Sequence, residues 1–140
     1  MTPKSTYNHK SITVADRKII KLILELPIKI ISEANNADHW SQKRKRRESI
    51  KDEVLIEMAK LLRGFPFRLP CQVVLTRFGA RRMDDDNLAN AFKAVRDAVA
   101  QKLRVDDGDT KNIKWIYDQD TYRYKEYGIK IQITSRGFPK

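Results

Sequence analysis

Residues 70–103 read PCQVVLTRFGARRMDDDNLANAFKAVRDAVAQKL and decide how the rest of the chain is interpreted. Branched apolar residues over 70–78 predict a β-strand, which Gly79 ends. Residues 87–103 then carry apolar side chains at helical spacing and predict an amphipathic helix. The apolar positions of this helix are Leu88, Ala91, Phe92, Val95, Val99 and Leu103. The stretch is therefore a strand followed by a helix, with an acidic segment between them.

The other expected elements extend this unit on both sides. Residues 17–26 are rich in branched apolar residues and predict a first strand, closed by Pro27. A helix is expected from Asp38, capped by Asp38 or Ser41, to Gly64. Two further strands are expected at residues 112–117 and 127–134. The order strand, helix, strand, helix, strand, strand predicts a small α+β fold, in which two main helices pack on a mixed β-sheet as two layers.

Length and cysteine content limit the class of protein. The 140 residues suit a single domain over residues 1–140. No apolar stretch approaches the ~20 residues that a membrane span needs, and the polar N-terminus lacks the apolar segment of a signal peptide. Cys71 is the one cysteine, which excludes an intrachain disulfide and is typical of a reducing compartment. We therefore expect a soluble cytoplasmic protein with no membrane partner.

The charge points to a polyanionic partner. The chain holds 29 basic and 18 acidic residues, a formal net charge of +11. Five consecutive basic residues open the helix expected after Asp38, and consecutive positions point all round a helix. The run is either a solvated face or a patch that contacts phosphates. Its candidate DNA-binding residues are Lys43, Arg44, Arg46 and Arg47.

The chain has three adjacent aspartates, Asp84, Asp85 and Asp86. Met83 alone separates them from Arg81 and Arg82. In an extended chain Asp84 and Asp86 point one way and Asp85 the other. Two such carboxylates suit Mg²⁺, which takes one or two carboxylates and completes its shell with water and substrate phosphate. The alternative is that Asp86 caps the following helix while the other two interact with its positive N-terminus.

Other metals and motifs fit less well. An EF-hand needs glycine at the sixth position of its loop, and counting from Asp84 that position holds Ala89. Zinc has few candidate ligands, since Cys71 is accompanied only by His9 and His39. The sequence Asp109-Thr110-Lys111 spells half of a restriction-type nuclease motif, but it stands in a turn and recurs easily by chance.

Taken in order, these motifs resemble the RusA family of Holliday-junction resolvases. The similar segments are Arg81-Arg82-Met83-Asp84-Asp85-Asp86-Asn87-Leu88, Phe92-Lys93-Ala94-Val95-Arg96-Asp97 and Val105-Asp106-Asp107-Gly108-Asp109, with weaker similarity at Asn35-Asn36 and His39-Trp40. The resemblance covers residues 81–117. It implies that Asp84, Asp86 and Asp107 are catalytic metal ligands, with Asp106 as a neighbouring acid. It also implies that Lys93 is a catalytic, DNA-contacting lysine four residues before Asp97.

The resemblance implies an activity as well. Members of the family hydrolyse DNA phosphodiesters at four-way junctions with Mg²⁺ or Mn²⁺, and they act as homodimers in bacteria or phage-infected cells during recombination and repair. Arg81 and Arg82 would help to position phosphate. The chain departs from the family archetype in having Met83, not arginine, before the first aspartate, and about three extra helical residues before Asp97. Two other functions stay open: a basic DNA-binding module without catalysis, and a nuclease for other branched DNA such as flaps.

Overall fold

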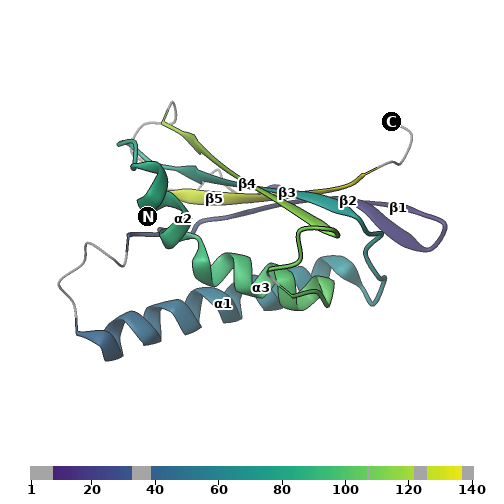
Figure 1. Cartoon of the computed structure of the whole chain (residues 1–140), viewed down its shortest axis with the longest axis horizontal. Coiled ribbons are helices and arrows are strands. Elements are labelled where there is room, and N and C mark those ends of the chain that lie inside the picture. Colours follow the sequence, from purple (N-terminus) through teal and green to yellow (C-terminus); the bar gives the residue numbers. More distant parts are fainter. Residues whose placement is uncertain (1–7, 33–38, 107, 122–125, 137–140) are drawn as a thin grey trace, which may run out of the picture.

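A single β-sheet with helices on one face makes up the fold (Figure 1). The computed structural model describes residues 8–32, 39–106, 108–121 and 126–136. The five strands lie in the order β1-β2-β5-β3-β4. They are β1 (Lys10–Ala15), β2 (Lys18–Leu26), β3 (Cys71–Phe78), β4 (Ile113–Asp120) and β5 (Gly128–Ser135). β3 and β4 are parallel and the other neighbours are antiparallel, so the predicted α+β fold with a mixed sheet is confirmed.

The N-terminal hairpin of β1 and β2 was not part of the sequence prediction, which placed a single strand at residues 17–26. The hairpin turns through Asp16 and Arg17, which both have positive φ, 51° and 62°. A two-residue turn with positive φ at both positions matches the right-handed twist of an antiparallel pair. The alternation of Ile12 and Val14 with polar residues was the available signal, but the segment is short and rich in polar side chains.

Helix α1 (Trp40–Leu62) is the long helix expected after Asp38. Its N-cap is His39, whose ring nitrogen Nδ1 accepts a hydrogen bond from the Ser41 backbone N–H at 3.2 Å. The proposed cap at Ser41 is therefore wrong, and Asp38 lies outside the described residues. The helix ends as expected, since Arg63 is left-handed and Gly64 follows with φ +81°. Among the described residues, no helix is both long and apolar enough to cross a membrane.

The helix predicted over residues 87–103 is divided in two. Helix α2 (Asp85–Ala91) ends at Phe92, and α3 (Lys93–Leu103) begins directly after it. Phe92 has φ −87° and ψ 0°, outside helical values, and its ring is fully buried at 6.0 Å from the ring of Tyr117 in β4. We attribute the break to this residue: the chain changes direction there while both helices keep apolar residues against the core.

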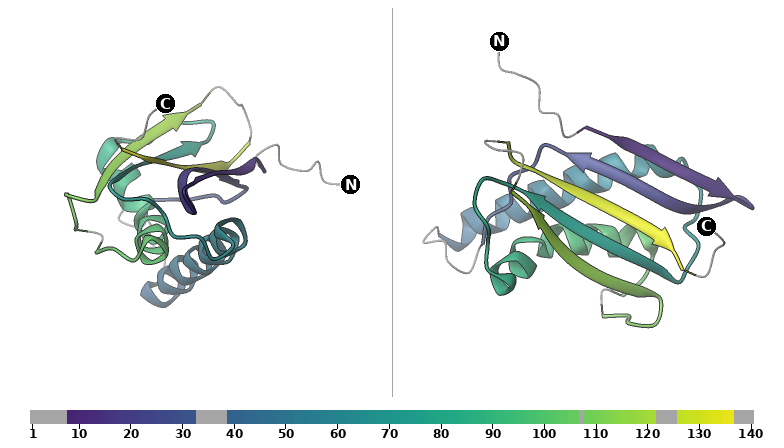
Figure 2. Two further views of the ribbon diagram at one scale, coloured as in Figure 1. Left: turned by 90° about the vertical axis from the view of Figure 1, so that its right-hand side faces the viewer. Right: turned by 90° about the horizontal axis from the view of Figure 1, so that it is seen from above.

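The hydrophobic core fills the space between the sheet and the helices α1 and α3, which lie side by side on one face (Figure 2). Strand alternation sends every second residue of β2, β3 and β5 to this face. Its buried strand residues include Leu22, Leu24, Val73, Leu75, Ile131 and Ile133, and its helical residues include Val54, Met58, Val95 and Val99. The core fixes β3 and β4 as a rigid base for the connection that runs from one to the other through α2 and α3.

Candidate functional site

The three aspartates stand at the start of α2. Asp84 is the N-cap residue by position, but its side chain makes no cap hydrogen bond, and Asp85 and Asp86 form the first turn. The predicted cap at Asp86 is therefore wrong. The predicted strand-like alternation is wrong as well, because the helix begins at Asp85 and successive helical residues are about 100° apart. All three side chains are exposed.

These carboxylates have no partner in the described part of the chain. No ion pair or side-chain hydrogen bond involves Asp84, Asp85 or Asp86 there. The neighbouring Arg81 and Arg82 are also exposed, and within the same residues their guanidinium groups are unpaired. The helix N-terminus favours nearby negative charge, but only by a fraction of a kcal/mol up to about 1 kcal/mol at an exposed site. Three acids and two arginines are thus left available to ligands.

The loop before α2 and the first turn of that helix are held by side chains of other segments. The amide of Gln119, in β4, brackets Met83: its Oε1 accepts from the Met83 N–H at 2.7 Å and its Nε2 donates to the Met83 carbonyl at 2.6 Å. From β3, Arg77 donates from Nη1 to the Arg81 carbonyl at 2.8 Å. At the other end of α2's first turn, the Ser32 hydroxyl donates to Asn87 Oδ1 at 3.1 Å. The acidic segment therefore has a fixed base.

Arg77 is a buried cation beneath this loop. It is 8% exposed, and burial lowers the pKa of its guanidinium, although arginine stays charged. A Cβ on Gly79 would lie 2.9 Å from Arg77 Nη2, so the absence of a side chain at Gly79 makes room for the guanidinium. Sequence reasoning did not single out Arg77 or Gln119. Both were expected within or next to strands, and no sequence pattern shows which side chain of one strand meets the loop after another.

Lys93 is exposed at the first residue of α3. A cation is disfavoured at a helix N-terminus, and the first turn of α3 contains no acidic residue that would compensate it. Lys93 also lacks an ion-pair partner among the described residues. Because of the break at Phe92, Asp86 and Lys93 do not lie on one continuous helix. Lys93 also directly follows the C-terminus of α2, whose negative end favours a cation, so the two helix ends act on it in opposite directions.

The basic run lies near the N-terminus of α1, at the same end of the molecule as α2 (Figures 1 and 2). Arg44 pairs with Glu48 at 3.1 Å across one helical turn. Arg44, Arg47, Glu48 and Lys51 line a hollow of about 210 Å³ together with Ala94 and Asp97 of α3. Lys43 and Arg46 are half-buried. The run thus gathers cations on the side of α1 that borders α3.

Asp106 lies far from these residues. The backbone carbonyl of Asn112, just before β4, accepts a hydrogen bond from the Cys71 N–H at the start of β3 (2.7 Å), whereas Met83 is bound to Gln119 near the end of β4. Seven residues of strand separate Asn112 from Gln119, roughly 23 Å at ~3.3 Å per residue. Asp106 and Gly108 belong to the turn at the Asn112 end, and Asp107 lies outside the described residues. One chain therefore does not bring Asp106 to Asp84 and Asp86.

Asp109 has a structural role in this turn. Its carboxylate accepts hydrogen bonds from the Lys111 N–H, the Asn112 N–H and the Asn112 side-chain amide, at 2.8–3.1 Å. The side-chain hydrogen bond from Asn112 is the main reason that the pKa of Asp109 is lowered. These hydrogen bonds give Asp109 a structural role in the turn, so the Asp109-Thr110-Lys111 sequence does not require a nuclease function.

The carboxylates of the site suit a hard cation, but the described residues offer few ligands for it. Asp84 and Asp86 offer exposed carboxylate oxygens, the ligand type that Mg²⁺ prefers, and one or two of them suffice when phosphate and water complete the shell. Among the described residues, no group of three or more histidine, cysteine or acidic side chains is arranged to hold a metal ion. Cys71 is buried in β3, where desolvation raises the pKa of its thiol to about 12, so it is no soft ligand at this site.

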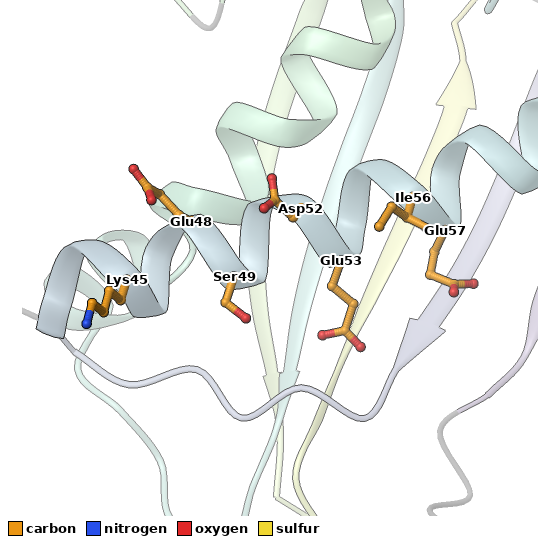
Figure 3. A pocket seen from close by; sticks show the side chains of 7 residues that line it. All are labelled: Lys45, Glu48, Ser49, Asp52, Glu53, Ile56 and Glu57. Atoms are coloured by element: carbon orange, nitrogen blue, oxygen red, sulfur yellow. The ribbon is translucent and has the colours of Figure 1, made fainter.

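A second hollow, of about 630 Å³, runs along α1 (Figure 3). The side chains that line it all belong to this helix: Lys45, Glu48, Ser49, Asp52, Glu53, Ile56 and Glu57. Four of these seven residues are acidic and one is basic. Glu57 is also paired with Lys10 of β1 at 2.7 Å, and this hydrogen bond lowers its pKa. An acidic surface repels phosphate, so we place no nucleic acid here.

No model of a known protein family matches the sequence, and no curated protein matches it significantly.

Proposed function

We propose that the protein is a metal-dependent DNA endonuclease of the RusA type that cleaves four-way junctions. One observation carries the proposal: Asp84, Asp85 and Asp86 are exposed and without partners in the described part of the chain, at the start of α2 and directly after a loop anchored by Gln119 and Arg77. Unpaired like charges held together are unfavourable unless a ligand compensates them. The +11 charge of the chain and its ordered motifs support DNA as the substrate.

The proposed chemistry divides between acidic and basic groups. Asp84 and Asp86 would hold Mg²⁺ or Mn²⁺, which when bound stabilises charge on a phosphate and lowers the pKa of an attacking water. Arg81 and Arg82 lie in the loop just before the aspartates, and they would bind and orient the phosphates beside the scissile bond. Lys93 would offer a further cation to the phosphate. Arg44 and Arg47, at the same end of the molecule, would bind DNA outside the cleaved position.

A homodimer would resolve the separation of the acids. Asp106 lies in the turn before β4, at the other end of that strand from Met83 and the acidic loop (residues 81–86, which run into the first turn of α2). If Asp106 acts with Asp84 and Asp86, the turn must come from a second copy of the chain. Two such composite sites related by a two-fold axis would suit a substrate that needs one cut in each of two opposed strands.

The test is an assay with a labelled four-way junction, a flap substrate and a matched linear duplex. Each is incubated with Mg²⁺, with Mn²⁺ and with EDTA. We expect paired cuts in the junction with either metal, little cleavage of the duplex and none in EDTA. Cleavage in EDTA would exclude the metal role. Preferred cutting of the flap would point to another branched substrate. Junction binding without cleavage under any of these conditions would leave the alternative of a DNA-binding module.

A further inference from the structure

A hollow of about 490 Å³ lies between the C-terminal ends of α1 and α3. The connection from Gly64 to Phe67 forms one wall, and Gln101, Lys102 and Arg104 form the opposite one. The hollow is at the Asn112 end of β4, opposite the end that carries α2 and the basic run of α1 (Figure 1). The proposed function therefore assigns nothing to it.

The rim of the hollow is cationic. Lys102 and Arg104 line it, and no acidic residue is among the described residues that do so. Neither cation has an ion-pair partner in the described part of the chain. Lys102 is favoured by the negative end of α3, which is the usual reason for a lysine in a last turn. Arg104 is exposed beyond the helix, at a left-handed C-cap position, so its guanidinium is free to meet an anion.

An aromatic side chain is held in place beside these cations. Phe65 is 38% exposed, and it lines the same hollow. Its segment is fixed on both sides: the Phe65 N–H donates to the Leu62 carbonyl at 2.8 Å, and the Ile19 N–H donates to the Pro66 carbonyl at 2.9 Å. The backbone that carries the ring is therefore fixed, so little backbone conformational entropy remains to be lost on binding.

An exposed ring beside unpaired cations suits a nucleotide. Single-stranded nucleic acids are bound by aromatic rings on which bases stack, next to cations that contact the backbone phosphates. An acidic peptide would satisfy Lys102 and Arg104 but would leave the Phe65 ring without a flat partner. Duplex DNA would satisfy the cations, but its stacked bases could not reach the ring.

We infer that this hollow binds an unpaired nucleotide of a DNA strand, with the base stacked on Phe65 and its phosphate on Lys102 and Arg104. The inference takes DNA as the ligand from the proposed function, but it concerns binding alone and does not require cleavage. Gaps, flaps and single-stranded ends of branched DNA offer such nucleotides. The site would act as a second DNA contact, about one strand length away from the acidic loop.

The experiment measures the affinity of the full chain for two labelled oligonucleotides in EDTA: a 15-residue oligothymidylate, and an abasic strand of the same length and charge. Phe65→Ala should weaken oligothymidylate binding about tenfold, within the range of one base–aromatic stack. Abasic binding should not change, and Phe65→Trp should retain full affinity. The double variant Lys102→Ala/Arg104→Ala should bind both oligonucleotides more weakly. It should also lower the slope of log affinity against log salt by about one to two.

Matched controls are Ile56→Ala, another exposed apolar residue, on the acidic face of α1, and Lys114→Ala, an exposed lysine of β4. Neither should alter binding. The inference is overturned if Phe65→Ala binds oligothymidylate like the parent, if it weakens the abasic strand equally, or if the controls lose as much affinity. Competition by polyglutamate as strong as by oligothymidylate would assign the hollow to an acidic protein instead. Because no cleavage is measured, a protein that fails to cut junctions can still pass this test.

Discussion

Asp84 and Asp86 are the residues on which the proposed chemistry depends. Replacing either by asparagine removes a negative ligand and nearly preserves its shape. Metal-dependent junction cleavage should fall at least ~100-fold, equivalent to about 2.7 kcal/mol of transition-state stabilisation. Junction affinity should stay the same or rise, since repulsion of phosphate decreases. Asp52→Asn, an exposed acid of α1, is the charge-matched control. Full cleavage by both variants would remove these residues from the site.

Gln119 is a residue whose importance only the structure reveals. Gln119→Leu removes both hydrogen bonds to the Met83 backbone and leaves those groups partly buried. We expect a loss of about 1–3 kcal/mol in the free energy of unfolding, measured by urea denaturation. Gln72→Leu is the control, because this half-buried glutamine of β3 makes no side-chain hydrogen bond within the described residues. Equal stability of the two leucine variants would mean that the bracket around Met83 contributes nothing.

At the scale of elements, the sequence predicted the strands and helices that bury a continuous apolar pattern. β3, β5 and the long helix α1 follow directly from alternation or helical spacing. β1 escaped notice because it is an edge strand with only one apolar face and polar neighbours. The division of α2 from α3 was also missed, since Phe92 continues the apolar helical pattern and only its tertiary packing against Tyr117 reveals the change in direction.

The division of α2 from α3 makes Lys93 the first residue of α3. The N-terminus of α3 disfavours its charge and the C-terminus of α2 favours it, so helix electrostatics alone do not explain the lysine, and the proposed function assigns it to phosphate. Lys93→Ala should reduce the cleavage rate tenfold or more, equivalent to ~1.4 kcal/mol, while the free energy of unfolding stays the same or rises. Lys93→Arg should restore part of the rate, because its charge is kept but its planar group differs. Lys21→Ala, in β2, serves as the control. If Lys93→Ala cleaves like the parent, Arg81 and Arg82 become the better candidates.

The basic run is a property of α1 as an element. Arg44 and Arg47 face the hollow shared with α3, at the end of the molecule that carries the acidic loop. Replacing both by alanine should weaken junction binding and lower the slope of log affinity against log salt by about one to two. The measurement is a salt titration of binding in EDTA. An unchanged slope would identify the run as a solvated helix face, the other interpretation that the sequence allowed.

At the scale of the whole molecule, the sequence could not show how far apart the acids lie. Asp84, Asp86 and Asp106 are close in the sequence, and the resemblance groups them in one site. The parallel pairing of β3 with β4 separates them, because the chain must travel back along α2 and α3 before β4 begins. Strand order and direction depend on contacts between distant segments, which neither alternation nor spacing reveals.

A mixing experiment tests whether two chains complete one site. One variant carries Asp84→Asn, and the other carries Asp106→Asn with Asp107→Asn; both should be inactive alone. Each composite site combines the acidic loop of one chain with the turn before β4 of the other chain. In a mixed dimer, one site therefore carries all the substitutions and the other carries none. Since half of the randomly assembled dimers are mixed and each has one intact site of two, co-refolding should restore about a quarter of the parental single-strand nicking.

The control for this experiment mixes Asp84→Asn with Asp86→Asn. Both substitutions lie in the same acidic loop, so every composite site retains one of them and nicking should stay at background. Paired cutting of the junction should not return in either mixture, because no mixed dimer has two intact sites. If each site were built within one chain, every chain would keep a defect and no mixture would recover. A first mixture as inactive as the control would therefore exclude the composite site while leaving the roles of Asp84 and Asp86 intact.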